Sequence, residues 1–152
     1  MSKLKIYVQS ILIPVALGTV VGFLTAGSMD YQALQKPAFA PPGFLFPIVW
    51  SILYILMGVS YGILKDKNLL NPTLSAVYYI QLGVNLLWPI VFFNLKWRLF
   101  AFIWILLLDA LVAVMAVLFC RKDKLAGLLQ LPYLAWVVFA SYLNFAFFIL
   151  NG

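Results

Sequence analysis

The sequence predicts an all-α integral membrane protein, a bundle of five transmembrane helices. Of its 152 residues, 66% are hydrophobic and 9% are charged, whereas soluble domains are about 45–50% apolar and about 25% charged. A chain this short cannot bury that much apolar surface inside itself, so the remaining solvent for it is lipid. The charges also fall into a few clusters separated by long apolar stretches. These observations exclude a soluble enzyme, a disordered chain and a coiled coil.

Length justifies each span, because a helix needs ~20 mainly apolar residues to cross about 30 Å of hydrocarbon. No charge occurs in residues 6–29, 37–64, 68–95 and 125–152, and the single charge in residues 99–120 is Asp109. Alternation of period two is weak throughout, which argues against a lipid-facing barrel. We therefore expect spans near 6–26, 44–64, 70–94, 99–119 and 127–149, and one long connection near 27–43.

The first span has features of a secretory signal, since Lys3 and Lys5 precede it and Ala26-Gly27-Ser28 follows it. The apolar core of a signal is about 7–15 residues long. The run here is longer and contains Pro14. We interpret it as a retained helix.

The Lys and Arg residues indicate the orientation, because they favour the cytoplasmic side of a membrane. Seven fall on one side, namely Lys3, Lys5, Lys65, Lys67, Arg121, Lys122 and Lys124, and three on the other, namely Lys36, Lys96 and Arg98. We expect a multi-pass protein whose N-terminus is cytoplasmic and whose C-terminus is outside. The net charge of +6 is thus a topology signal, and we expect no nucleic-acid partner.

Several chemistries are excluded because their residues are absent. The chain has no His and no Glu, its acids are Asp30, Asp66, Asp109 and Asp123, and Cys120 is its single cysteine. A His-based zinc site, a Ser-His-Asp triad, an internal disulfide and a cysteine metal cage are therefore impossible. Asp109 is the one ionisable residue deep in a span. It is either a functional group or an Asp protonated or hydrogen-bonded against a neighbouring helix.

Small residues and prolines mark helix faces and bends. Gly18 and Gly22 in the first span, and Gly58 and Gly62 in the second, have the spacing of four that lets helix backbones approach closely. These pairs pack either inside the bundle or across a dimer. Prolines at positions 14, 47, 89 and 132 fall inside the expected spans, and a proline there bends the helix.

The segment 31–50 is a candidate lid, because it holds four of the eight prolines and five aromatic residues. Its aromatics either cover a cavity mouth or lie in the interfacial belt. Aromatic and polar residues also share helix faces in three stripes: Trp50, Tyr54, Met57 and Tyr61; Gln81, Asn85, Trp88 and Phe92; and Trp136, Phe139, Ala140, Leu143 and Phe147, with Asn144 at the margin.

Such stripes either pack or line a binding cavity, and lipid-facing aromatics are a further alternative. The amides of Gln81 and Asn85 favour the cavity, because buried amides need partners. A cavity lined this way suits a flat, hydrophobic ligand that stacks on aromatic rings. It does not suit a sugar, an ion or a nucleotide.

These residues resemble the signature of the translocator protein family, also called tryptophan-rich sensory proteins or peripheral benzodiazepine receptors. The resemblance covers nearly the whole chain and looks closest to bacterial members. It rests on Leu34-Gln35-Lys36-Pro37, Pro41-Pro42, Pro47, Trp50, Leu53-Tyr54 and Met57-Gly58; on Gln81-Leu82, Asn85, Trp88-Pro89 and Phe92-Phe93; and on Leu131-Pro132-Tyr133, Trp136, Phe139-Ala140 and Leu143-Asn144.

The resemblance implies a five-helix bundle in the bacterial cell membrane, commonly a homodimer. It implies a pocket beneath the first loop that binds porphyrins such as protoporphyrin IX, and synthetic benzodiazepine-site ligands. No cofactor is required, and the porphyrin is ligand or substrate. The residues carried over to this pocket are Tyr31, Pro41, Pro42, Ile48, Trp50, Tyr54, Asn85, Trp88, Phe92, Phe100, Trp136, Ala140 and Leu143.

The sequence departs from animal members of the family in two places. Positions 39 and 44 are Phe where animal members tend to have Trp, and no Lys or Arg follows Tyr142 within reach. The sterol-recognition pattern of animal members is therefore incomplete after Tyr142.

Three functions stay open. The aromatic stripes and the loop favour a membrane receptor or sensor that binds tetrapyrroles. Some bacterial members are linked to light-dependent oxidative breakdown of protoporphyrin, for which Trp50 and Trp136 are the carried-over catalytic candidates. The third function is a small transporter of tetrapyrroles or lipids, which Asp109 motivates.

Overall fold

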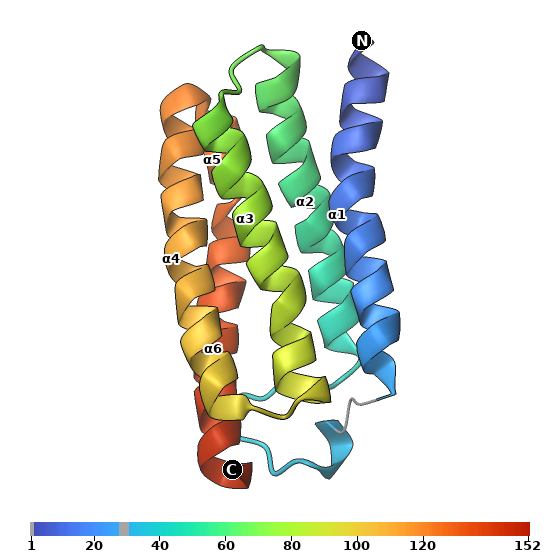
Figure 1. The fold of residues 1–152 in the computed structure, drawn as a ribbon, viewed down its shortest axis with the longest axis vertical. Helices are drawn as coiled ribbons and strands as arrows, with labels where there is room; N and C mark the ends of the chain where they lie inside the picture. The colour runs from blue at the N-terminus through green and yellow to red at the C-terminus, as the bar shows by residue number, and fades with distance from the viewer. Residues whose placement is uncertain (1, 28–30) are drawn as a thin grey trace.

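The computed structural model describes residues 2–27 and 31–152, and in these residues it contains helices and no strand (Figure 1). Five segments are long and apolar enough to cross a membrane. This finding confirms the predicted all-α, five-span fold. The helices are α1 (Lys3–Ala26), η1 (Tyr31–Ala33), α2 (Leu45–Asp66), α3 (Pro72–Pro89), η2 (Ile90–Asn94), α4 (Arg98–Lys122), α5 (Lys124–Leu128) and α6 (Leu131–Asn151).

The five long helices run alternately up and down, so the N-terminus and the C-terminus lie at opposite ends of the bundle (Figure 1). The connection between α1 and α2 lies at the C-terminal end, which we call the loop end. The opposite end, where α1 begins, is called the N-terminal end. Helix α1 packs mainly on α2, whereas α4 packs on α3 and α6. Helix α1 thus stands at one edge of the bundle and α4 at the other.

Local chemistry explains where the helices begin. The Asn71 side chain accepts a hydrogen bond from the Leu74 amide at 2.9 Å and so caps α3, whose first residue is Pro72. Asp123 caps α5 in the same way through the Ala126 amide at 3.1 Å. The short helix α5 uses the residues predicted to open the fifth span, so α6 begins at Leu131.

Two of the four prolines expected inside spans stand at helix starts instead. Pro47 lies in the first turn of α2 and Pro132 in the first turn of α6. The missing proline N–H is not needed there, so neither residue has to bend its helix. The interpretation of these two as bends is therefore wrong. Pro14 does lie inside α1, and Pro89 ends α3.

The glycine pair of α2 brings the backbones of α1 and α2 together. A Cβ atom added at Gly58 would lie 2.5 Å from the carbonyl oxygen of Ser10, and one at Gly62 would lie 2.8 Å from the Tyr7 ring. Helical pairing would give the Ser10 carbonyl a donor at residue 14, but Pro14 has no N–H. The α2 backbone approaches α1 at this carbonyl. For this pair, packing inside the bundle is confirmed.

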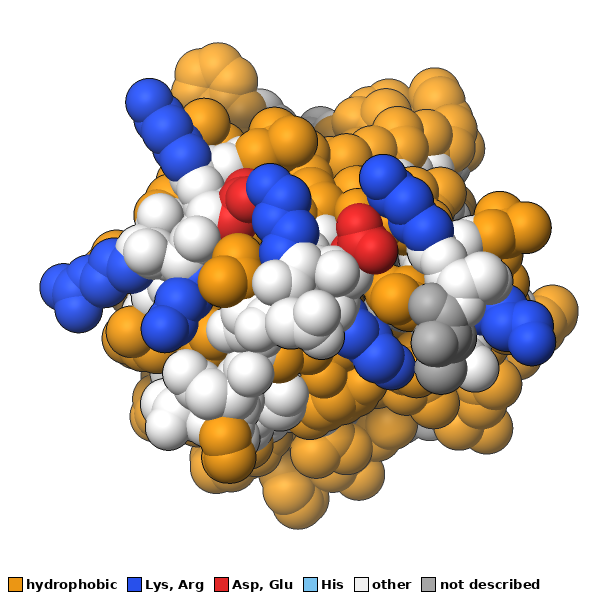
Figure 2. Space-filling model, turned by 90° about the horizontal axis from the view of Figure 1, so that it is seen from above, with side chains coloured by type: hydrophobic (Ala, Val, Ile, Leu, Met, Phe, Trp, Pro, Cys, Tyr) orange, Lys and Arg blue, Asp and Glu red, His pale blue; other side chains and the backbone are white. Residues whose placement is uncertain are grey.

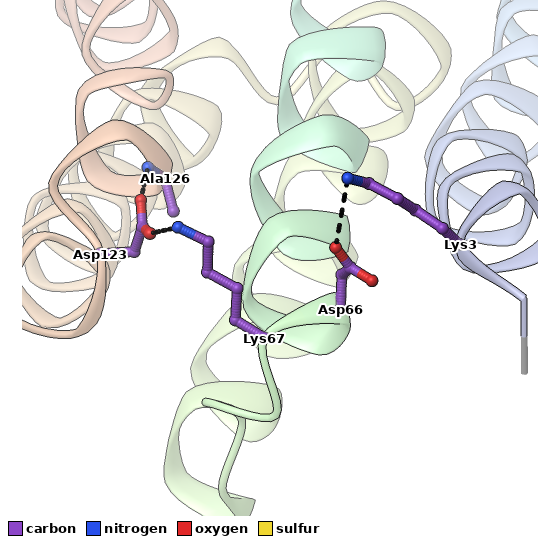
Figure 3. Close-up of polar contacts among 5 residues, drawn as sticks. All are labelled: Lys3, Asp66, Lys67, Asp123 and Ala126. Atoms are coloured by element: carbon purple, nitrogen blue, oxygen red, sulfur yellow. Dashed lines mark hydrogen bonds and ion pairs between the residues drawn. The ribbon is translucent and has the colours of Figure 1, made fainter.

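Lys and Arg side chains gather at the N-terminal end, with acidic side chains among them (Figure 2). Two ion pairs tie elements together there (Figure 3): Lys3 Nζ lies 3.9 Å from Asp66 Oδ2, and Lys67 Nζ lies 2.5 Å from Asp123 Oδ2. The hydrogen bond from Lys67 holds the pKa of the Asp123 carboxyl below its usual range. The first pair joins α1 to α2, and the second joins the end of α2 to the start of α5.

Asp109 is hydrogen-bonded to a neighbouring helix. This arrangement agrees with the second interpretation of Asp109, a structural role, given above. The Ser141 hydroxyl of α6 donates to Asp109 Oδ2 at 2.7 Å. The same hydroxyl lies 2.9 Å from the Val137 carbonyl oxygen. The pair is therefore part of the contact between α4 and α6.

Candidate ligand cavity

A cavity of about 490 Å³ lies in the loop-end half of the bundle. Its wall comes from α1, α2, α3, η2, α6 and the connection between α1 and α2. No described lining residue is charged, and none belongs to α4. The lining residues are Val15, Gly18, Thr19, Val21, Gly22, Phe23, Thr25, Ala26, Tyr31, Gly43, Phe46, Pro47, Trp50, Ser51, Tyr54, Asn85, Trp88, Pro89, Phe92, Phe93, Trp136, Ala140, Leu143, Asn144 and Phe147.

Helix α1 contributes a wall of small residues. A Cβ atom at Gly18 would overlap the Tyr54 ring, whereas one at Gly22 would meet no heavy atom within 4 Å. The hydroxyls of Thr19 and Thr25 donate to carbonyls of their own helix, at 2.8 Å to Val15 and 3.0 Å to Val21. The polar atoms of this wall are thus satisfied within α1, and its face toward the cavity is effectively apolar.

The aromatic stripe of α2 lines the cavity at one end and lies in the core at the other. Trp50 and Tyr54 line the cavity, with ring centroids 5.8 Å apart. Met57 and Tyr61 follow on the same face and are buried in the core. Ile48 is two residues from Trp50, which is about 200° around a helix. Ile48 is 51% exposed and is not among the residues that line the cavity.

A chain of buried hydrogen bonds fixes the inner end of the cavity. The Tyr54 hydroxyl donates to Asn85 Oδ1 at 2.6 Å, and Asn85 Nδ2 donates to the Tyr133 hydroxyl at 2.7 Å. Tyr133 in turn donates to Gln81 Oε1 at 2.7 Å. The expectation that both amides need partners is confirmed. Because these groups satisfy one another, they hold the Tyr54 ring in place.

A second hydrogen-bond chain fixes Trp88. Its indole N–H donates to Asn144 Oδ1 at 2.9 Å, and Asn144 Nδ2 donates to the Arg98 carbonyl at 2.8 Å. The Trp88 ring stacks on Phe92 with a centroid separation of 5.1 Å, and Phe92 meets Phe147 edge to face at 6.2 Å. This aromatic cluster forms the loop-end part of the wall.

The π-helix η2 shapes the same part of the wall. Pro89 ends α3, and the wider turn Ile90–Asn94 follows directly. Both Phe92 and Phe93, although adjacent in sequence, line the cavity. Single π turns inside helical segments are frequent at functional sites.

Hydrogen bonds fasten the described part of the predicted loop to α6 and to itself. The Tyr142 hydroxyl donates to the Ala38 carbonyl at 2.6 Å. The Asn151 side chain accepts from the Gln35 amide and donates to the Gln35 carbonyl, both at 2.9 Å. The Tyr31 hydroxyl donates to the Pro41 carbonyl. Residues 28–30 of the predicted loop lie outside the described residues.

The structure brings nine of the thirteen predicted ligand residues together in one wall: Tyr31, Trp50, Tyr54, Asn85, Trp88, Phe92, Trp136, Ala140 and Leu143. Pro41, Pro42, Ile48 and Phe100 are not part of it. Pro41 supports Tyr31 through its carbonyl. Phe100 lies on α4, which stands outside the cavity, and its side chain is 48% exposed. Ligand contacts remain predictions for all thirteen residues.

The residues predicted from the sequence to line the cavity included none from α1. The signal was present in the Gly18–Gly22 spacing, but small residues at this spacing equally favour helix packing. Gly18 does both, since it faces Tyr54 and lines the wall. The described residues contain no group of three or more metal-ligating side chains.

Comparison with known proteins finds similarity along nearly the whole chain. A model of the TspO/MBR family matches residues 10–150. The Tryptophan-rich protein TspO of Archaeoglobus fulgidus is 40% identical over 155 residues, covering 100% of both chains. The Tryptophan-rich sensory protein of Cereibacter sphaeroides is 36% identical and covers 80% of this chain and 76% of its own. The Translocator protein of Ovis aries is 36% identical and covers 76% of this chain and 70% of its own.

Proposed function

Because the chain belongs to the TspO/MBR family, we propose that it is a membrane receptor that binds porphyrins, protoporphyrin IX above all, in the loop-end cavity. Synthetic benzodiazepine-site ligands would occupy the same cavity. The relatives named translocator protein and tryptophan-rich sensory protein support a receptor or sensor role. The protein itself is a multi-pass membrane protein with five apolar helices.

The observation that carries this proposal is the chemistry of the cavity wall. Trp50, Trp88 and Trp136 all line it, and no described lining residue is charged. Its volume of about 490 Å³ lies within the ~300–1,000 Å³ typical of small-molecule pockets. Aromatic faces around an apolar space bind flat conjugated rings by stacking.

A dark titration tests the proposal. Protoporphyrin IX is added to the protein in detergent while tryptophan fluorescence is followed, with a benzodiazepine-site ligand as competitor. We expect saturable quenching that the competitor reverses. Trp136→Phe should weaken binding, because the smaller ring loses stacking area. Linear quenching that no competitor reverses would mean partition into the micelle and would contradict the proposal.

Light-dependent porphyrin breakdown is the second candidate function. Trp50 and Trp136 lie in the same wall, so a bound porphyrin would lie near two oxidisable indoles. An excited porphyrin would take one electron from an indole and pass it to dioxygen, which becomes superoxide. The oxidised indole would then regain an electron from the porphyrin, and superoxide would add to the porphyrin radical cation so formed. Under illumination in air, a new absorbing product should form more slowly with Trp136→Phe or Trp50→Phe. Equal rates for the variants, or for lipid without protein, would exclude a role of these indoles.

Transport of tetrapyrroles or lipids has less support. Asp109, which motivated it, is bonded to Ser141 in the contact between α4 and α6 and is absent from the cavity wall. Uptake into liposomes that is lost in Asp109→Asn would favour transport.

The family resemblance also implies a homodimer in the bacterial cell membrane, and we include this in the proposal. Cross-linking in membranes tests it.

A further inference from the structure

The cavity wall offers no counter-charge to a ligand with acidic groups. No Lys or Arg is among the described lining residues. A carboxylate without a partner is costly to bury in an apolar site. Protoporphyrin IX carries two carboxylates on one edge of a flat apolar ring. If this cavity takes such a ligand, the acidic edge has to stay at a place where the protein supplies a cation.

Lys36 supplies a cation beside the wall. Its ammonium nitrogen lies 4.9 Å from the centroid of the Tyr31 ring, and Tyr31 lines the cavity with 9% of its surface exposed. The same ammonium lies 3.5 Å from the Leu34 carbonyl oxygen. Lys36 is itself exposed. The Lys36 ammonium therefore lies against a ring that lines the cavity.

Hydrogen bonds to α6 hold the backbone of the loop before and after Lys36 in the sequence. Gln35, the preceding residue, has both backbone groups bonded to the Asn151 side chain of α6 at 2.9 Å. Ala38, two residues further on, accepts the Tyr142 hydroxyl at 2.6 Å. Two anchors on α6 thus set the backbone position of Lys36.

The surroundings of Arg98 and of the described Asp residues differ from those of Lys36. Arg98 at the loop end is 8% exposed, stacks behind the Phe92 ring at 5.4 Å and donates to the Gly152 carbonyl at 3.4 Å. Of the three Asp residues that the structure describes, Asp66 and Asp123 lie at the N-terminal end. Asp109 lies in the contact between α4 and α6. None of these three Asp side chains therefore competes for Lys36.

We propose that Lys36 is the carboxylate-recognition residue of the cavity, which makes the site selective for acidic tetrapyrroles over their neutral esters. The ring lies among the aromatic side chains, and the carboxylate edge points to the loop end, where the Lys36 ammonium pairs with it. This inference rests on the proposed function, and it adds both the orientation of the ligand and its chemical class.

The test compares two ligands with the same porphyrin ring, protoporphyrin IX and its dimethyl ester, in which each carboxylate is replaced by an uncharged methyl ester. Binding is measured in the dark for the wild type, Lys36→Gln, Lys36→Arg and Lys96→Gln. Lys36→Gln should weaken binding of the acid about tenfold, the order of magnitude of one charge-assisted hydrogen bond. It should leave binding of the ester within about twofold. Lys36→Arg should keep the preference for the acid, since it keeps the positive charge.

Lys96→Gln is the matched control, because it removes an exposed Lys at the same end of the bundle. It should leave binding of both ligands within about twofold. Equal weakening of acid and ester in Lys36→Gln would overturn the inference, as it would show a general effect on the loop. No change with either ligand would also overturn it. If the wild type bound neither ligand saturably, the proposed function itself would fail.

Discussion

Gly18 in α1 and Tyr54 in α2 show how one residue without a side chain positions another that lines the cavity. The Tyr54 ring occupies the space that a Cβ atom at Gly18 would need. Its hydroxyl is then directed to Asn85 Oδ1 at 2.6 Å. The position of this ring thus depends on a glycine in one helix and an amide in another.

Replacing Gly18 by Ala should therefore impair ligand binding. The new methyl group pushes the Tyr54 ring aside and weakens its bond to Asn85, and overpacking of this kind costs about 1–3 kcal/mol. We expect the Kd for protoporphyrin IX to rise about tenfold, which corresponds to about 1.4 kcal/mol. Fluorescence titration measures this change.

Gly22→Ala is the control on the same helix face, where a Cβ atom meets no heavy atom within 4 Å. Its Kd should stay within about threefold of the wild type, because the methyl group removes only a small part of the cavity volume. If Gly18→Ala and Gly22→Ala bound the ligand equally well, the position of Tyr54 would not matter for binding.

At the scale of elements, α1 is held chiefly by its contact with α2. Within that contact the Gly58 backbone approaches the Ser10 carbonyl. Helix α1 also supplies one wall of the cavity. The same packing that keeps this helix on the bundle therefore keeps the cavity closed on that side.

Gly58→Ala should destabilise the protein. The added Cβ would lie 2.5 Å from backbone atoms of Ser10 and Ile11, and backbone cannot yield as a flexible side chain does. We expect a loss of about 1–3 kcal/mol in the free energy of unfolding, measured by denaturant titration in mixed micelles. Gly83→Ala is the control, since its Cβ meets nothing within 4 Å. Equal stability of the two variants would contradict the close contact.

The loop is a second element whose role can be measured. Replacing Asn151 by Ala and Tyr142 by Phe removes three hydrogen bonds that fasten Gln35 and Ala38 to α6. The cavity cover is then less restrained, so we expect the dissociation rate of protoporphyrin IX to rise about tenfold. Stopped-flow dilution measures this rate.

The control for the loop variant is Tyr7→Phe. Its hydroxyl makes no hydrogen bond among the described residues, and its ring lies beside Gly62, far from the loop. Its dissociation rate should match that of the wild type. An unchanged rate in the loop variant would mean that the ligand leaves by another route.

For the molecule as a whole, the sequence predicts the number and order of the membrane spans well, because the thickness of a membrane dictates their length. Helical spacing also predicts the wall residues of α2, α3 and α6, such as Trp50, Asn85 and Trp136. The π turn at Ile90–Asn94 was not predicted, since it depends on how the chain leaves Pro89. The outward position of Phe100 was missed for a different reason. Which face of α4 packs inward is decided by neighbours that a single helix pattern does not reveal.

The orientation in the membrane is the remaining property of the whole molecule, and the charges argue for a cytoplasmic N-terminal end. Seven Lys and Arg residues lie at that end and three at the loop end. The two ion pairs involve Asp66 and Asp123, but acidic residues contribute little to the orientation rule. Neither pair therefore weakens the bias that the seven cations create.

Cysteine labelling in whole cells tests this orientation. In a Cys120→Ser background, Lys96→Cys places a thiol at the loop end and Lys5→Cys places one at the N-terminal end, both at exposed positions. A membrane-impermeant maleimide should label Lys96→Cys in intact cells and label Lys5→Cys only after permeabilisation. The reverse pattern would place the cavity mouth in the cytoplasm. Labelling of both variants in intact cells would mean that the chain inserts in two orientations, and the bias of seven cations over three would then be too weak to fix one.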